Sequence, residues 1–171
     1  LYPEQSIPKE VPLHWTGRYQ TWNTMCAACH STNLRKNYRP EADVFETAWD
    51  EVTVGCQACH GPGTRHLKWA EKRTGESDQA YGLVVNFRAG DSRYEVDQCA
   101  PCHSRRTQIT ANPEAGASYL DQYVPQLLTE GLYHADGQIL DEVYVYGSFL
   151  QSRMYHRGVK CSDCHNSHSL S

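Results

Sequence analysis

All eight cysteines of the 171-residue chain fall in four copies of one pentapeptide, Cys-x-x-Cys-His. The copies are CAACH (Cys26, Cys29, His30), CQACH (Cys56, Cys59, His60), CAPCH (Cys99, Cys102, His103) and CSDCH (Cys161, Cys164, His165). This pattern is the attachment signature of c-type haem. The two sulfurs form thioethers with the porphyrin vinyl groups, and the adjacent histidine supplies an axial nitrogen to the iron. The sequence therefore predicts four covalently bound haem c groups, each with its iron.

Three other chemistries use cysteines in similar patterns, but each accounts for only part of the Cys-x-x-Cys-His pattern. Four disulfides would use eight cysteines but give no reason for a histidine after every second cysteine. Zinc ribbons pair two Cys-x-x-Cys units and need no adjoining histidine. CAPCH alone is compatible with a thioredoxin-like redox motif, but nothing around Cys99 indicates a strand–helix unit. Haem attachment is the interpretation that accounts for every cysteine.

Five histidines remain after the four proximal ones, which is enough to give every iron a second histidine ligand. They are His14, His66, His134, His156 and His168. Methionine is the competing ligand type, and the chain has Met25, which adjoins Cys26, and Met154. The count predicts bis-histidine irons with one histidine to spare, either His134 or His156.

His66 and His168 follow their nearest proximal histidines by only a few residues. A tether of this length does not readily pass round the edge of a porphyrin to its other face. We therefore expect both histidines to bind haems other than their own. The haems attached at Cys26/Cys29 and at Cys99/Cys102 are the expected recipients.

Composition excludes several classes of function. The net charge is −4, from 16 Lys and Arg against 20 Asp and Glu, and no basic run indicates a nucleic-acid partner. No apolar stretch is long enough to predict a membrane span. No signal-peptide pattern appears from Leu1 onward, which is compatible with a secreted protein whose leader was cleaved off. No Ser-His-Asp triad, phosphate-binding loop or catalytic carboxylate pair is recognisable in the sequence.

The elements that must position the motifs are short. The motif spacings show no fixed repeat, and four haems leave few residues each for a polypeptide core. We predict a single tetrahaem domain over residues 1–171, made mostly of loops with short α-helices and little β-structure. This is a multihaem cytochrome c architecture wrapped around four closely packed haems.

Local signals predict individual elements within this architecture. Helices are expected over residues 64–75, from Val124-Pro125-Gln126, and over residues 147–158. A hairpin turn is expected at Asp136-Gly137, a short strand at 81–87, and loops at 71–80 and 111–118.

Long stretches of the chain resemble the large multihaem c-type cytochromes whose haem region is followed by tetratricopeptide repeats. The matching stretches are LHWTGRYQTWNTMCAACHSTNLRKNY, VGCQACHGPGTRHLKWA, QCAPCHSRRTQI and EGLYHADGQILDEVYVYGSFLQSRMYHRGVKCSDCHNSHSL. Members usually carry a further haem motif on each side and then the repeats, none of which appears in this sequence. The resemblance implies electron transfer. It also implies that His14, His66, His134 and His168 are the distal ligands and that His156 is the spare histidine.

The expected function is electron transfer without bond chemistry, so the chain is not expected to be an enzyme. The alternative is a multihaem reductase of the nitrite or hydroxylamine type with one open haem. Haem attachment of this kind predicts a periplasmic, cell-surface or extracellular location. The chain is also similar in size and haem count to tetrahaem cytochromes that form extracellular conductive filaments. By analogy, its partners are other electron-transfer proteins or, in a head-to-tail polymer, copies of itself.

Overall fold

The computed structural model describes residues 6–12, 14–17, 19–72 and 80–169. The chain divides into two compact units, Leu1–Gly55 and Cys56–Ser171. The single tetrahaem domain over residues 1–171 stays a prediction.

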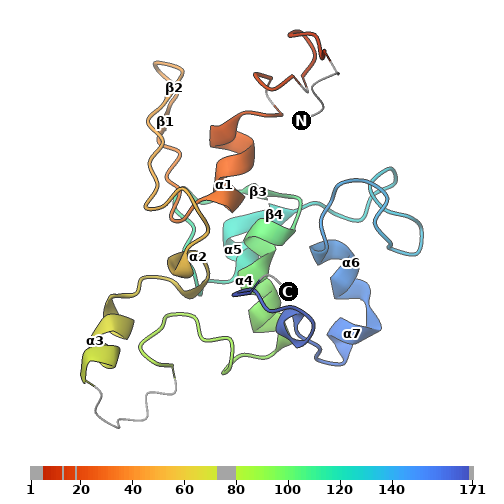
Figure 1. Ribbon diagram of the computed structural model, residues 1–171. Helices are drawn as coiled ribbons and strands as arrows, with labels where there is room; N and C mark the ends of the chain where they lie inside the picture. Colours follow the sequence, from red (N-terminus) through yellow and green to blue (C-terminus); the bar gives the residue numbers. More distant parts are fainter. Residues whose placement is uncertain (1–5, 13, 18, 73–79, 170–171) are drawn as a thin grey trace. The chain divides into compact units, whose positions relative to one another are not determined.

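The first unit has two helical segments followed by a hairpin. A π-helical turn, η1 (Trp22–Cys26), leads directly into α1 (Ala27–His30). Strands β1 (Tyr38–Arg39) and β2 (Val44–Phe45) pair in antiparallel register, and Figure 1 shows them as a narrow arm. Isolated bridges from Thr32 to Glu51 and from Arg35 to Ala48 extend the pairing toward the base of the arm. The segment between the first two haem motifs is therefore one irregular hairpin.

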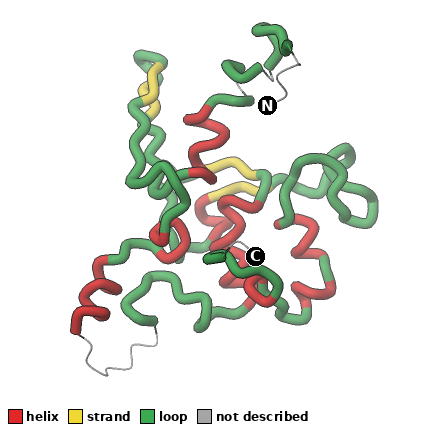
Figure 2. Tube along the Cα trace, in the orientation of Figure 1, coloured by secondary structure: helices red, strands yellow, loops and turns green. Residues whose placement is uncertain are grey.

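The second unit is built around α4, which is the longest helix described. Its elements are α2 (Cys56–His60), α3 (Thr64–Lys72), α4 (Ser92–His103), β3 (Arg106–Gln108), α5 (Tyr119–Gln122), β4 (Tyr123–Pro125), α6 (Tyr146–Gln151), α7 (Arg153–His156) and the 3₁₀ turn η2 (Cys161–Asp163). Helix α4 contacts α5, α6 and η2. Strands β3 and β4 form the second antiparallel pair. Loops make up most of the trace in Figure 2, which confirms the predicted mixture of loops and short helices with little β-structure.

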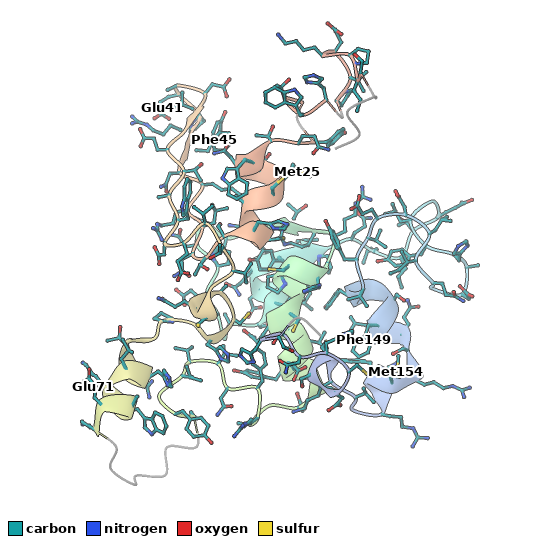
Figure 3. All side chains as sticks on the ribbon, in the orientation of Figure 1. Met25, Glu41, Phe45, Glu71, Phe149 and Met154 are labelled. Carbon is teal, nitrogen blue, oxygen red and sulfur yellow. The ribbon has the colours of Figure 1, made fainter. Side chains whose placement is uncertain are left out.

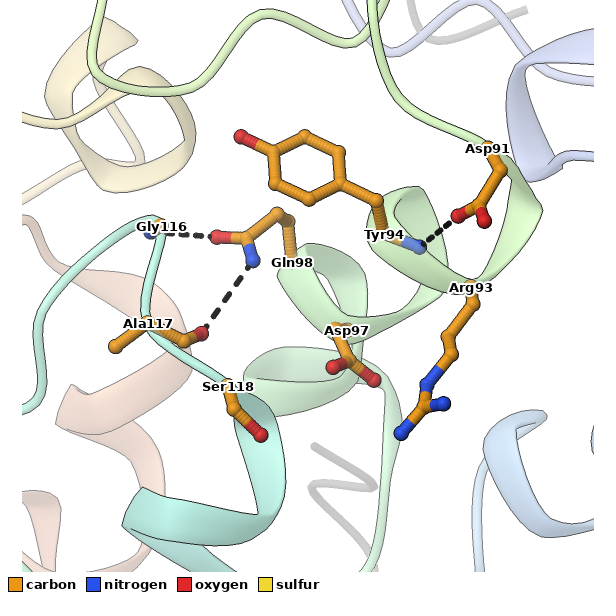
Figure 4. Close-up of a pocket in the computed structure, with 8 residues that line it drawn as sticks. All are labelled: Asp91, Arg93, Tyr94, Asp97, Gln98, Gly116, Ala117 and Ser118. Carbon is orange, nitrogen blue, oxygen red and sulfur yellow. Dashed lines mark hydrogen bonds between the residues drawn. The ribbon is translucent and has the colours of Figure 1, made fainter.

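Helix α4 begins at a well-formed cap. Asp91 Oδ1 accepts a hydrogen bond of 2.8 Å from the backbone N–H of Tyr94, which satisfies one of the free donors of the first turn. Figure 4 shows how the helix holds the loop beside it: Gln98 accepts a 2.8 Å bond from Gly116 N and donates a 3.5 Å bond to Ala117 O. Gln98 adjoins Cys99, so these bonds fix the helix just before the third haem motif.

The core of the second unit is small and mixes tyrosines with aliphatic side chains; its buried apolar residues are Val85, Val96, Ala100, Tyr119, Tyr123, Tyr133 and Val143. Ala100, Tyr119 and Tyr123 form the buried cluster, and Tyr146 packs against it. The Tyr119 ring lies 5.4 Å from that of Tyr123 and 5.0 Å from that of Tyr146. Ala100 belongs to the third haem motif, so this motif packs directly against the core.

Several local expectations differ from the structure. The helix predicted from Val124 is wrong: Pro125 instead ends strand β4, where a residue without an N–H is tolerated at an edge. The helix predicted over 147–158 is two helices, because Ser152 ends α6 and its hydroxyl caps α7 by accepting from Tyr155 N at 3.2 Å. Residues 81–87 form turns and no strand.

Other expectations are confirmed. Helix α3 begins at Thr64 as predicted, whereas its expected end near residue 75 lies outside the described residues. Asp136-Gly137 forms a tight turn, in which His134 N donates to Gln138 O at 2.8 Å, although only a single bridge flanks it. Residues 111–118 are loop and turn.

Candidate haem-binding site

All four motifs lie on helical turns. The first spans the junction of η1 and α1, the second is α2 itself, the third ends α4, and the fourth includes η2. In the fourth motif His165 N donates to Cys161 O at 2.9 Å, which completes an α-helical turn. Residues three and four apart on a helix lie on one face. Both cysteines and the histidine of each motif are therefore presented on the same side, as attachment to one planar group requires.

The first and third motifs each end in the same type of hydrogen bond. Each is followed by a buried serine, and the serine hydroxyl donates back to the carbonyl of the alanine after the first cysteine. Ser31 Oγ reaches Ala27 O at 2.6 Å, and Ser104 Oγ reaches Ala100 O at 2.6 Å. Ser104 is also within 2.6 Å of the Tyr119 hydroxyl. This joins the third motif to the tyrosines of the core.

The second motif is held through its histidine. The Nδ1 atom of His60 lies 2.9 Å from the carbonyl oxygen of Val85, and Val85 N donates to His60 O at 3.2 Å. A ring nitrogen that donates to a backbone carbonyl fixes the tautomer with Nε2 free for a metal. Gly61, with φ +73°, ends α2 directly after this histidine. Phe87 packs edge-on against the ring at 5.3 Å.

The fourth motif is bound to the helix that carries the third. Glu95, which is 2% exposed, accepts 2.6 Å and 2.8 Å hydrogen bonds from Ser162 N and Ser162 Oγ. Lys160 Nζ donates to the carbonyls of Phe87 and Gly90 in the segment before α4. The residues flanking Cys161 are thereby fixed to α4.

The first cysteines of the third and fourth motifs meet as a result. The Cys99 thiol hydrogen-bonds to Cys161, and this bond lowers the pKa of the Cys161 thiol to about 7. The same bond, with burial, raises the pKa of Cys99. A lowered thiol pKa raises the fraction of thiolate, which is the nucleophilic form.

Two candidate distal histidines have defined ring environments. His66, in α3, places Nδ1 2.7 Å from the carbonyl oxygen of Tyr81, so its Nε2 is also free for a metal. The next residue, Gly82, has φ +70°, and a Cβ there would lie 2.6 Å from Arg65 O. The Trp69 ring lies nearly parallel to that of His66 at 5.7 Å. His14 Nδ1 is 2.8 Å from Thr16 Oγ1, in the first unit.

The other three candidates, His134, His156 and His168, are exposed, and the ring of His168 lies near that of a proximal histidine. His134 lies in the turn before Gly137, and His156 ends α7 with its ring 5.7 Å from that of Tyr155. The ring of His168 lies 6.2 Å from that of His60, and the two planes are within 6° of parallel. Nothing in the sequence indicated this pair.

The two methionines, the competing ligand type, lie at the surface. Met25 and Met154, labelled in Figure 3, are 49% and 53% exposed. Among the described residues, no set of three or more His, Cys, Asp or Glu side chains is arranged to hold a metal ion by itself. The donor set of the four motifs fits haem c, which brings its own four ring nitrogens and needs only axial ligands from the chain.

Comparison with known proteins gives one match. The family described as cytochrome c554 and c-prime matches residues 4–61, a stretch that includes the first two haem motifs and His14. Searches of curated proteins and of solved structures gave no match. No helix in the described ranges is long and apolar enough to cross a membrane. The family match supports the interpretation of this chain as a c-type cytochrome, a haem protein of electron transport.

Proposed function

We propose that the chain is a tetrahaem c-type cytochrome that transfers electrons and catalyses no bond chemistry. One observation carries the proposal: every cysteine belongs to a Cys-x-x-Cys-His motif, and every motif lies on a helical turn. Haem supplies one-electron redox chemistry when it is bound. The chain's part is to attach, ligate and cover each haem.

The roles divide by residue type. The cysteine pairs Cys26/Cys29, Cys56/Cys59, Cys99/Cys102 and Cys161/Cys164 attach the four haems, and His30, His60, His103 and His165 are the proximal ligands. His14, His66, His134 and His168 are the distal ligands, and His156 is surplus. Two histidines on an iron give a lower potential than a His/Met pair does.

The environments of two histidines support this assignment. His60 is proximal by its motif, and its Nδ1 bonds to a backbone carbonyl. His66 has no motif, yet its Nδ1 bonds to a backbone carbonyl in the same way. This second-sphere contact is the usual companion of a metal-ligating histidine. The shared arrangement favours a ligand role for His66.

The same chemistry supports the proposed location, and the proposed assembly rests on analogy with tetrahaem cytochromes of similar size. Covalent haem attachment of this type predicts a protein that works outside the cytoplasmic membrane. Its partners would be other electron-transfer proteins or copies of itself. Few residues per haem leave haem edges near the surface, which suits transfer between molecules in either case. Negative-stain microscopy of native material separates a head-to-tail filament from discrete particles.

The spin state of the irons tests the proposal against the reductase alternative. If every iron has two histidines, electron paramagnetic resonance of the oxidised protein shows low-spin haem only. Carbon monoxide and nitrite then bind slowly or not at all. A strong high-spin signal with rapid ligand binding would establish an open haem and favour the enzyme.

A further inference from the structure

The second and fourth haem motifs are linked by a pair of histidine rings. His60 belongs to the second motif, and His168 follows His165 of the fourth. Their ring centroids are 6.2 Å apart, and their planes differ by 6°. The two residues are remote in sequence, so this approach depends on the fold of the second unit.

The distance agrees with two imidazoles on opposite sides of one iron. Two metal–nitrogen bonds of about 2.0 Å each, plus about 1.1 Å from each coordinating nitrogen to its ring centroid, give a centroid separation of about 6 Å. Ordinary aromatic pairs span about 4.5–7 Å, so the distance alone is also compatible with simple packing. The chemistry of the two residues distinguishes the cases.

The His60 ring is already prepared as a ligand. Its Nδ1 is bonded to Val85 O, which leaves Nε2 free. Phe87 packs edge-on against the same ring and restricts its rotation. The first of the two rings therefore has a fixed orientation and a free coordinating nitrogen.

The backbone at His168 is also fixed. Asn166 Oδ1 accepts hydrogen bonds from His168 N at 3.0 Å and from Ser169 N at 3.3 Å. This local turn begins directly after His165, the proximal ligand of the fourth motif. His168 is therefore presented by a turn anchored at one haem motif, beside the proximal histidine of another.

We propose that His168 is the second axial ligand of the haem attached at Cys56 and Cys59, opposite His60. The proposal rests on the tetrahaem function and specifies one of its ligand pairs. It assigns His168 to the second motif, in place of the third motif that the tether argument favoured. The turn from His165 to His168 then joins the second and fourth haems as neighbours.

The first experiment compares two histidine variants of the holoprotein. In H168A, one quarter of the iron should become high-spin and bind carbon monoxide, and added imidazole should restore the low-spin spectrum. H156A is the matched control, because His156 is exposed like His168 and is the histidine proposed as surplus, and it should leave all four irons low-spin. If H168A also leaves all irons low-spin, His168 is not a ligand and the proposal is overturned.

A second experiment identifies which haem changes. Replacing Cys56 and Cys59 by serine removes the second haem and gives a three-haem protein. Adding H168A to this background should produce no further high-spin iron. A new high-spin iron there would place His168 on another haem and overturn the proposal. If the three-haem protein does not accumulate, a crystal structure of the wild-type holoprotein decides the same question.

Failure of the proposed function has a different signature. Intact mass counts the haems of the wild-type protein independently of their ligands. A mass below that of four haems would contradict the tetrahaem assignment itself. A mass of four haems with an unaffected H168A protein would contradict only the ligand pair.

Discussion

Replacing Glu95 with alanine should weaken the attachment of the fourth haem motif to α4. The Glu95 carboxylate is buried and accepts hydrogen bonds from both the backbone and the hydroxyl of Ser162. With the contact between Cys99 and Cys161, these bonds link the turn that carries Cys161 to the helix that carries Cys99. The substitution removes both acceptors at once.

The expected magnitude follows from the two bonds. Hydrogen bonds to a charged group contribute about 1.5–3 kcal/mol each, and water replaces part of this because Ser162 is exposed. The free energy of unfolding should therefore fall by about 2–4 kcal/mol in E95A. S162A removes only the hydroxyl bond and should cost about 1–2 kcal/mol. E95Q should cost less than E95A, because its amide oxygen still accepts one bond and the Ser162 hydroxyl can turn to accept from its NH₂.

Guanidinium unfolding of the holoprotein, followed by the Soret band and by circular dichroism, measures these differences. Hydrogen exchange over residues 160–165 should be faster in E95A, since local opening there needs less free energy. The order of stability should be wild type, S162A, then E95A. Equal unfolding midpoints for E95A and wild type would refute the reasoning that this buried contact holds the motif.

Three further outcomes are expected. G82A should shift part of one iron to the high-spin state, because the added Cβ would clash with the backbone at Arg65 and displace the Tyr81 carbonyl from His66. G131A is the control, since Gly131 has a similar positive φ but open space around it, and its spectrum should not change. An unchanged spectrum in G82A as well would contradict the ligand role of His66. Burial raises the pKa of Tyr146 in the folded protein to about 12, above the value of about 10 for the unfolded chain. The free energy of unfolding should therefore fall as the pH rises from about 10 toward 12, because the unfolded chain loses the phenol proton first. Denaturant midpoints measured across this range test the expectation. Y146F should lose less over that window, and an identical loss would argue against this tyrosine. The intact mass of the native protein should equal the polypeptide plus four haems, and the bare polypeptide mass would exclude covalent attachment.

The haem motifs were predictable from the sequence because covalent attachment fixes both residue type and spacing. The start of α3 at Thr64 and the turn at Gly137 were also predictable from local signals. Helix α4 was missed, although Asp91 before Ser-Arg-Tyr-Glu is a helix-start signal. Its last turn is the CAPCH motif, in which Pro101 is a residue that normally breaks a helix and so hides the helical signal.

Contacts between remote segments could not be predicted in this way. Nothing local to Glu95 indicates Ser162 as its partner, and nothing local to His168 indicates His60. Both contacts depend on how the chain returns to α4 after α7. The break at Ser152 is a related case, since Ser152 is neither Gly nor Pro and ends α6 by capping the next helix.

The small core has a consequence for how the protein is made. The described residues bury only a few apolar side chains, among them the cluster of Ala100, Tyr119 and Tyr123, which is little to stabilise a chain of this length. We expect folding to be completed only as the haems are attached, so that maturation and folding are one process. Cys99 and Cys161 meet in the fold, so a chain that reaches this fold before its haems are attached is liable to pair these two thiols under oxidising conditions. Biogenesis would then depend on a reductant that keeps the immature chain open until its last haem is attached.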